Sequence, residues 1–207
     1  MRRSVPALAL AALALLVSAP AAAHDGHHAG HEGHSTLPAG KVSQTGDSIY
    51  VLGGAYTDQD GKQVVLAQLA GKPVLITMMY ATCPHACPML ISDIKRMEKA
   101  LPAEVRKELR VVLVTFDPDR DTPEALKKLR DAHGVDTDRW TFLRTDAEKV
   151  RELAAVLGIR YRFAADGSIG HSSVITLLDR KGAIKGRLEG ARQPNEDLVR
   201  KIVAEAR

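Results

Sequence analysis

The sequence lacks most features that mark a membrane-spanning, nucleic-acid-binding or disulfide-rich protein. Its N-terminal uncharged apolar run, Ala7 to Val17, is shorter than the roughly 20 residues that cross a bilayer. Basic residues outnumber acidic ones by only four, which gives no reason to expect nucleic acid as a partner. Cysteine occurs only twice, and neither cysteine lies near the N-terminus, which argues against a lipoprotein anchor.

The first 23 residues are typical of a cleaved signal peptide. Arg2 and Arg3 give a basic start, and three alanines at 21–23 supply the small residues of a cleavage site. Cleavage after Ala23 would remove both arginines and reduce the excess of basic residues from four to two. We therefore predict an exported protein of the periplasm with no membrane span after cleavage. An uncleaved N-terminal anchor is the alternative.

Residues 24–44 form a polar segment that is rich in histidine and has too few apolar residues to build a core. We predict a disordered tail here, followed by one folded domain over 45–207. A new amino terminus beside His24 could chelate Cu(II), Zn(II) or Ni(II) as a secondary metal site. The alternative is a polar tether without a metal role. The tail histidines are His24, His27, His28, His31 and His34.

Strand and helix patterns alternate through the predicted domain, which indicates an α/β fold. The specific prediction is a thioredoxin-like fold, with a central mixed sheet flanked by helices. Caps and breakers predict a helix that starts at Thr122-Pro123 and one that is closed by Gly158. The predicted strands are 48–52, 63–66, 74–80, 110–116, 140–143, 159–163, 173–178 and 183–188. The predicted helices are 88–101, 122–133, 146–157 and 195–206.

Cys83 and Cys87 lie between a predicted buried strand and a predicted helix, a position suited to redox or soft-metal chemistry. Residues four apart share one face of a helix, so two thiolates could bind one ion or close into a disulfide. Their spacing is not the CxxC of ordinary disulfide oxidoreductases. A purely structural disulfide is disfavoured, because so short a loop closes little chain entropy.

His171 directly precedes another predicted strand, at a junction that faces the dithiol loop in a thioredoxin-like fold. Two sulfurs and an imidazole suit Cu(I) or Cu(II), and zinc would accept them with a fourth ligand. A hydrogen-bonded loop histidine is the alternative for this residue taken alone.

Several neighbouring residues have a metal-related and a structural interpretation. His85 could be a fourth ligand, but we expect an exposed loop residue. Asp117 and Asp121 could shape the site, although for Asp121 we expect a turn and a helix cap. Met78 and Met79 are expected in the core, and Met89 remains an open candidate for a soft ligand.

Three motifs in order resemble the Sco/SenC family of copper proteins from about residue 47 to the C-terminus. CPHACP at 83–88 is similar to that family's CPxxCP, and DPDRDTP at 117–123 to its DPxRDTP. His171 and LLD at 177–179 resemble its late histidine segment. The resemblance implies a thioredoxin-like fold that binds copper through Cys83, Cys87 and His171. It also implies a role in forming the CuA centre of cytochrome c oxidase, either by delivering copper or by keeping the thiols of that centre reduced.

Some residues depart from the family pattern while the ligand set stays intact. His85 stands where the family often has an acidic residue, and Gly170 where it often has aspartate before the histidine. A cleaved signal replaces the usual membrane anchor. These departures concern metal affinity, redox tuning and the choice of partner.

The sequence therefore predicts a periplasmic copper chaperone, and it leaves two alternatives. The chaperone needs a periplasmic thiol reductant, because copper binds only when both cysteines are reduced. Its client would be the oxidase subunit that carries CuA, or another periplasmic copper protein. The first alternative is a thiol-disulfide oxidoreductase that reduces an apo-metal site. The second is a copper-tolerance or redox-sensing protein whose main metal site is the tail.

Overall fold

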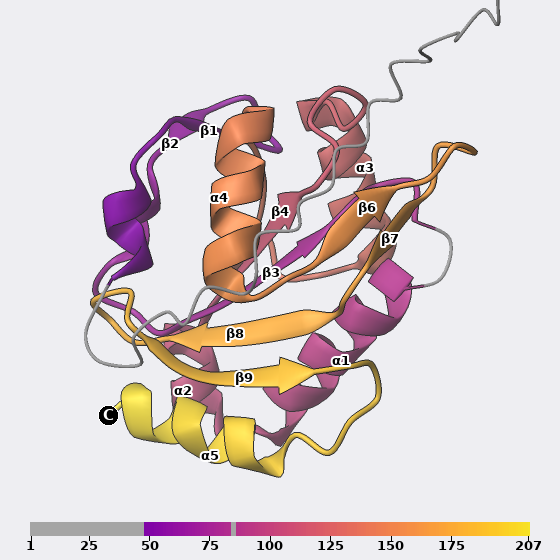
Figure 1. Ribbon diagram of the computed structural model, residues 1–207. Helices are drawn as coiled ribbons and strands as arrows, with labels where there is room; N and C mark the ends of the chain where they lie inside the picture. Colours follow the sequence, from indigo (N-terminus) through magenta and orange to yellow (C-terminus); the bar gives the residue numbers. More distant parts are fainter. Residues whose placement is uncertain (1–47, 84–85) are drawn as a thin grey trace, which may run out of the picture. The chain divides into compact units, whose positions relative to one another are not determined.

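The computed structural model describes residues 48–83 and 86–207. The predicted leader and tail, Pro84 and His85 lie outside the described residues. A seven-stranded mixed sheet in the order β2-β1-β5-β4-β3-β8-β9 forms the centre of the described domain. Figure 1 shows helices on both sides of this sheet, with α4 in front and α1 behind. This arrangement confirms the predicted α/β fold with a central mixed sheet.

The middle of the sheet is parallel and its flanks are antiparallel. β3 pairs in parallel with β4, and β4 with β5, whereas β3–β8, β8–β9, β1–β5 and β1–β2 are antiparallel. Both faces of β3 and β4 are covered, so their sequences read as continuous apolar runs. The strands are β1 Tyr56–Asp58, β2 Gln63–Val64, β3 Val74–Met79, β4 Arg110–Thr115, β5 Trp140–Arg144, β8 Val174–Leu178 and β9 Ile184–Glu189.

Most helices begin and end where the sequence predicted. The Thr122 hydroxyl accepts a hydrogen bond from the Ala125 amide, 3.3 Å, and the Asp146 carboxylate caps the next helix. Gly134 and Gly158 end these two helices in the left-handed conformation. The α-helices are α1 Ala86–Ala100, α2 Ala103–Glu108, α3 Pro123–His133, α4 Ala147–Leu157 and α5 Glu196–Glu205. The 3₁₀ helices are η1 Ile49–Leu52 and η2 Leu66–Leu69.

The core lies between the sheet and its helices and fixes how α1 sits against β3. Leu90, Ile91, Ile94 and Met97 form a buried stripe along α1, at the spacing of one helix face. Met78 and Met79 are both buried in β3, as expected for core residues. Because this packing holds α1 in place, the Cys87 that it carries has a fixed position at the end of β3.

The structure corrects or extends the predicted elements at six places. Tyr56–Asp58 is an unpredicted strand, β1, and the strand predicted at 63–66 ends at Val64, before the 3₁₀ helix η2. The strand predicted at 48–52 is wrong: Ile49–Leu52 is the 3₁₀ helix η1, and Ser48 forms an isolated bridge to Ala183. Helix α2 was not predicted. Asn195 stands at the start of α5 without a side-chain capping bond. The last difference bears on function, because Ile169–His171 forms an unpredicted strand, β7.

β7 pairs antiparallel with β6, Tyr161–Phe163, to form a separate two-stranded sheet. His171 therefore ends a strand and does not lie in an irregular loop. In Figure 1 this hairpin extends away from the seven-stranded sheet. Within residues 48–83 and 86–207, no helix has the length and apolar character needed to span a bilayer.

We predict that Gly182→Ala destabilises the domain more than Gly61→Ala does. Both glycines have positive φ, +85° and +78°, which costs an alanine about 1–2 kcal/mol. A Cβ at Gly182 would also lie 2.6 Å from the Tyr50 ring, whereas open space surrounds Gly61. Urea unfolding should therefore show an added loss of about 1–3 kcal/mol for Gly182→Ala. Equal losses would contradict this close contact.

Candidate metal centre

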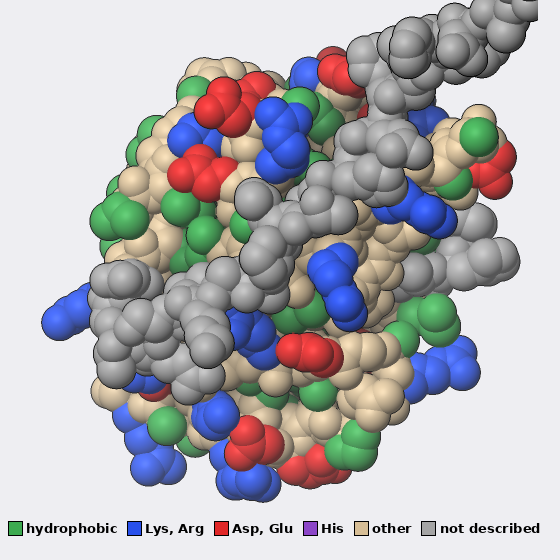
Figure 2. All heavy atoms as spheres, in the orientation of Figure 1, with side chains coloured by type: hydrophobic (Ala, Val, Ile, Leu, Met, Phe, Trp, Pro, Cys, Tyr) green, Lys and Arg blue, Asp and Glu red, His purple; other side chains and the backbone are tan. Residues whose placement is uncertain are grey.

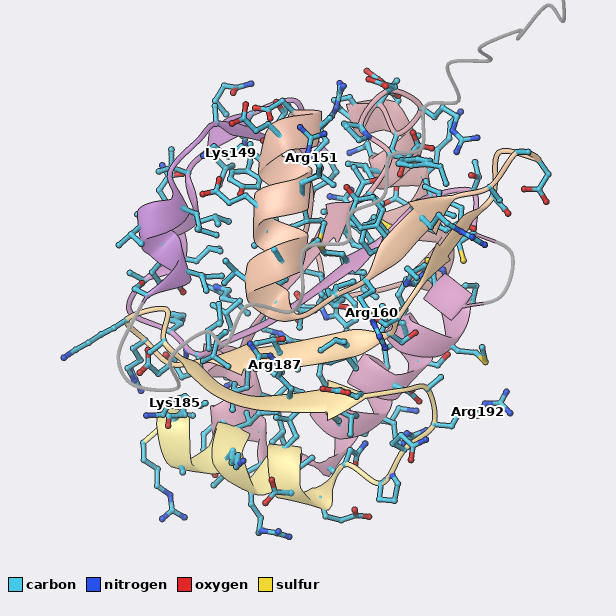
Figure 3. All side chains as sticks on the ribbon, in the orientation of Figure 1. Lys149, Arg151, Arg160, Lys185, Arg187 and Arg192 are labelled. Atoms are coloured by element: carbon cyan, nitrogen blue, oxygen red, sulfur yellow. The ribbon has the colours of Figure 1, made fainter. Side chains whose placement is uncertain are left out.

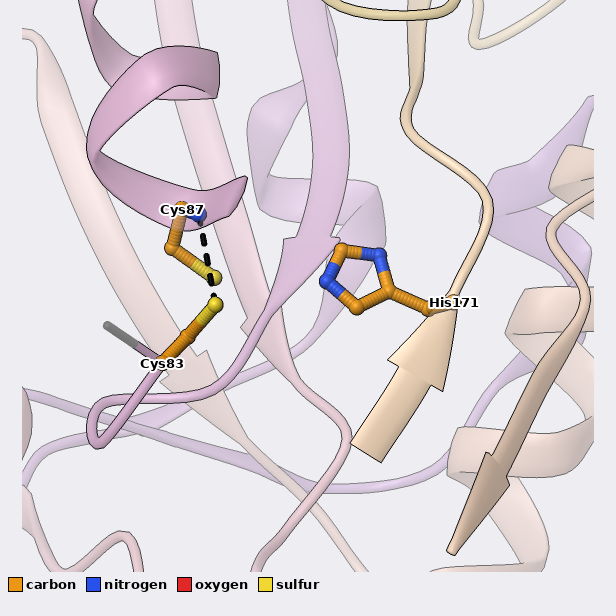
Figure 4. Close-up of side chains that lie close together, drawn as sticks. All are labelled: Cys83, Cys87 and His171. Atoms are coloured by element: carbon orange, nitrogen blue, oxygen red, sulfur yellow. Dashed lines mark hydrogen bonds between the residues drawn. The ribbon is translucent and has the colours of Figure 1, made fainter. Parts of the chain in front are cut away.

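The structure brings Cys83, Cys87 and His171 together at one end of the sheet. Cys83 follows β3, Cys87 lies in the first turn of α1, and His171 ends β7. One potential ligand atom from each residue lies within 4.8 Å of the other two. Figure 4 shows the two sulfurs facing each other and the imidazole approaching from the opposite side. The cluster is therefore assembled from three separate segments of the chain.

The two cysteines differ in their surroundings. Cys83 is half-buried and Cys87 is buried, and no disulfide bond joins them. The Cys87 amide donates a hydrogen bond to Cys83 Sγ, 3.4 Å. Burial raises the pKa of Cys87, and the nearby Cys83 and Asp121 raise it further. A metal ion that binds Cys87 must therefore displace a proton.

His171 presents one ring nitrogen for a ligand. Its Nδ1 lies 3.1 Å from the Ser172 carbonyl oxygen, so Nδ1–H donates and Nε2 keeps a lone pair. Nε2 points toward the sulfurs, is buried, and has no hydrogen-bond partner within the described part of the chain. Burial lowers the pKa of His171, which favours the neutral imidazole that metals require.

Aromatic rings fix the orientation of this imidazole. The Phe116 ring centroid lies 4.9 Å from that of His171, and Tyr80 meets the imidazole edge-on at 6.1 Å. The Ile169 amide donates a hydrogen bond to the Tyr80 hydroxyl, 3.4 Å, and links β7 to the end of β3. These contacts hold the histidine in place from both sides.

The donor set fits a soft or borderline metal ion. Two thiols and an imidazole are the ligands that copper prefers, and the unpartnered Nε2 leaves a coordination role open. Zinc would need a fourth ligand. His85, a possible fourth ligand that we expected to be an exposed loop residue, lies outside the described residues. Met89 is half-buried on α1 and stays an untested candidate.

The DPDRDTP segment connects the two halves of the cluster. Asp121 Oδ2 accepts hydrogen bonds from the Ala81 amide, 2.9 Å, and from the Thr115 hydroxyl. The first bond holds the chain two residues before Cys83. The Asp121 side chain therefore does not cap α3 as predicted, because Thr122 is the N-cap.

The same segment also holds the hairpin that carries His171. Arg120 Nε donates to the Asp117 carboxylate, and another guanidinium nitrogen donates to the Gly167 carbonyl, 2.8 Å. Gly167 lies at the turn between β6 and β7. The loop thus joins the cysteine segment through Asp121 and the histidine hairpin through Arg120.

Sequence reasoning missed the supporting residues Thr115, Phe116 and Ser172. Thr115 ends the apolar strand β4, and Phe116 follows it. A polar residue after a hydrophobic run was a usable signal for Thr115. Ser172 follows His171. Its amide donates a hydrogen bond to the Arg160 carbonyl oxygen, 2.8 Å, and its hydroxyl oxygen accepts one from the Arg160 amide, 3.0 Å. No local pattern indicated that pairing, because β7 itself was not predicted.

Comparisons with known proteins agree with this arrangement. A family model described as SCO1/SenC matches residues 50–207. A Stutzerimonas stutzeri protein described as copper-binding is 30% identical over 135 residues, which cover 63% of this chain and 65% of that protein. The match thus spans just under two thirds of that relative's length.

Solved structures show the same fold. A SCO1/SenC family lipoprotein from Bacillus anthracis superposes with a TM-score of 0.67 at 25% identity, covering 75% of this chain and 94% of that one. BsSco, described as a member of the Sco family of cytochrome c oxidase assembly proteins, gives 0.65 at 23% identity, covering 74% and 91%.

We predict that Asp121→Ala lowers the free energy of unfolding by about 1–3 kcal/mol, because it leaves the Ala81 amide and Thr115 hydroxyl without their acceptor. Cys83 should also react faster with a thiol reagent. Asp119→Ala is the matched control, since Asp119 is an exposed aspartate in the same loop. Unchanged stability and thiol reactivity in Asp121→Ala would contradict the connecting role of this loop.

We predict that the apo-protein loses part of its stability below about pH 6.5 through His171. Its pKa in the folded state lies below the ordinary 6.5, so the unfolded chain takes up the proton first as pH falls. His171→Gln removes this contribution, and the stability of wild type relative to the variant should decrease from pH 7.5 to 5.5. His133 is present in both proteins, so its contribution to the pH dependence cancels in the difference. A difference independent of pH in urea unfolding would refute the prediction.

Proposed function

Because the chain belongs to the SCO1/SenC family, we propose that it is a periplasmic copper chaperone for the CuA centre of cytochrome c oxidase. The observation that carries the proposal is the cluster of Cys83, Cys87 and His171, whose ligand atoms lie within 4.8 Å of one another. The copper-binding description of the Stutzerimonas stutzeri relative supports the choice of metal.

Each residue has a separate role in holding copper. Cys83 and Cys87 supply thiolates, and His171 supplies Nε2 while its Nδ1–H stays bound to Ser172. Loading displaces the proton that burial retains on Cys87. Cys83 is less buried than Cys87, so an incoming ligand reaches the metal most readily from its side. Copper is cargo in this scheme and leaves by exchange of ligands.

The proposed setting follows from the predicted leader and from the redox chemistry of the dithiol. Export to the periplasm places Cys83 and Cys87 in an oxidising compartment, where they can close into a disulfide. A periplasmic thiol reductant must then restore both thiols before copper binds. The tail histidines His24, His27, His28, His31 and His34 form the proposed secondary metal site.

A thiol-disulfide reductase is the second candidate, and the unequal burial of the cysteines favours it. The more exposed Cys83 would attack a client disulfide as a thiolate, forming a mixed disulfide and releasing one client thiolate. Cys87 would then attack Cys83 Sγ, which releases the second client thiolate and leaves a Cys83–Cys87 disulfide. His171 makes no bond in this sequence, and this separates the two functions.

We predict that Cys83→Ser, Cys87→Ser and His171→Ala each weaken Cu(I) binding by more than about 10–100-fold, the usual effect of losing a mere supporting residue. The measurement is competition with a Cu(I) chelator, using reduced protein whose five tail histidines are replaced by serine. His133→Ala controls for loss of a histidine outside the cluster.

The same variants separate the two candidate functions. A chaperone requires that His171→Ala loses copper transfer, whereas a reductase keeps its thiol-disulfide exchange rate in this variant. Wild-type Cu(I) affinity in all three variants would overturn the proposed site and the chaperone function with it.

A further inference from the structure

Tyr80 contacts all three residues of the metal cluster. It follows β3 directly and is buried. Its carbonyl oxygen accepts a hydrogen bond from the Cys83 amide, 3.2 Å, and its own amide donates one to the Cys87 sulfur. Its ring meets the His171 imidazole edge-on, with 6.1 Å between the centroids. The backbone and the ring of one residue therefore touch both cysteines and the histidine.

The Tyr80 hydroxyl lies between the Cys83 sulfur and the hairpin that carries His171. The Ile169 amide donates a hydrogen bond to its oxygen, 3.4 Å, and the hydroxyl also hydrogen-bonds the Cys83 side chain. Burial raises the pKa of Tyr80, so the phenol keeps its proton at neutral pH. The thiolate that metal binding requires can only accept a hydrogen bond. The Tyr80 hydroxyl is therefore the donor to the Cys83 sulfur in the metal-binding form.

The register of the hairpin explains why the Ile169 amide reaches Tyr80. The Ala164 amide donates a hydrogen bond to the Ser168 carbonyl oxygen, 2.9 Å. Bonded and non-bonded pairs alternate along an antiparallel ladder, so the next pair, Phe163 with Ile169, is non-bonded. The Ile169 amide therefore points away from β6, and the Tyr80 hydroxyl is its acceptor. This bond joins β7 to the segment that leads to Cys83.

The Tyr80 hydroxyl is a neutral donor, whereas a nearby cation is a common means of stabilising a thiolate. Figures 2 and 3 show lysine and arginine side chains on α4, before β6, on β9 and in the loop after β9, and none of these segments carries a residue of the cluster. The cations labelled in Figure 3 are Lys149, Arg151, Arg160, Lys185, Arg187 and Arg192. Because the phenol is neutral, Tyr80→Phe removes a donor to sulfur and leaves the charge of the site unchanged.

We propose that Tyr80 is a positioning residue of the metal centre, whose hydroxyl joins the Cys83 sulfur to β7 and shifts the preference of the site from Cu(II) toward Cu(I). Hydrogen bonding around a cysteine sulfur tunes the redox potential of a copper–thiolate centre. The bond withdraws electron density from the sulfur, and Cu(II) depends on that density more than Cu(I) does. The inference rests on the proposed function, because it takes copper as the ion that the cluster holds.

The ratio of Cu(II) affinity to Cu(I) affinity tests this role. Tyr80→Phe should raise the ratio about three- to tenfold, the effect expected of one hydrogen bond. A less ordered cluster would weaken the binding of both ions, and that loss cancels in the ratio. The measurement is competition with a Cu(I) chelator and, separately, with a Cu(II) chelator, on reduced protein whose tail histidines are replaced by serine. Free thiols are counted afterwards to show that neither ion has oxidised them.

Tyr161→Phe is the matched control, because it removes a hydroxyl from a neighbouring buried ring that stacks on Phe116. This variant should keep the wild-type affinity ratio. Amide hydrogen exchange of the apo-proteins, followed by NMR, gives a second readout that involves no metal. The Ile169 amide should exchange at least about threefold faster in Tyr80→Phe, because it loses its acceptor, and at the wild-type rate in Tyr161→Phe.

The outcomes separate this proposal from the proposed function. An unchanged affinity ratio or an unchanged Ile169 exchange rate in Tyr80→Phe would overturn the role of Tyr80 and leave copper binding by the cluster intact. An equal rise of the ratio in Tyr161→Phe would overturn it too. A wild-type protein that binds neither copper ion would overturn the proposed function and this role together. A raised ratio and faster Ile169 exchange in Tyr80→Phe, with wild-type values in Tyr161→Phe, support the proposal.

Discussion

The metal cluster depends on one loop, residues 117–122, that holds two distant segments of the chain at a fixed separation. The Asp121 carboxylate accepts a hydrogen bond from the Ala81 amide, two residues before Cys83. The Arg120 guanidinium donates a hydrogen bond to the Gly167 carbonyl at the tip of the β6–β7 hairpin. The hairpin is not part of the main sheet, so sheet hydrogen bonds do not fix its position. Without these side-chain bonds, the imidazole would be held by ring packing and by the bond from the Ile169 amide to the Tyr80 hydroxyl.

This requirement explains why a loop without metal ligands carries so distinctive a sequence. Asp121 is buried, and burial raises its pKa, so an ionised carboxylate here is costly. The Ala81 amide and the Thr115 hydroxyl offset part of that cost, while Oδ1 has no hydrogen-bond partner within residues 48–83 and 86–207. An apolar residue would avoid the cost and would leave the Ala81 amide without its acceptor.

The parts that could be predicted from the sequence are those with a local signal. The apolar runs of β3 and β4, the Thr122 cap and the Gly158 stop gave their elements directly, and the order of the motifs placed the dithiol between β3 and α1. The β7 strand could not be predicted, because Ile169–His171 is short and pairs only with β6. The bond from Asp121 to Ala81 links residues 40 positions apart, and no local rule distinguishes it from the helix cap that we expected.

The surroundings of the three candidate ligand side chains set up a competition among protons, metal and disulfide. The neutral imidazole of His171 is ready for metal, whereas burial holds a proton on Cys87. A bound metal compensates for the cost of deprotonating Cys87, and a disulfide avoids that cost by removing the thiol altogether. In the proposed function, copper retention depends on the reductant that reaches Cys83, the more exposed sulfur. Because the proposed copper acceptor would approach the same sulfur, reduction and delivery would use one opening and exclude each other in time.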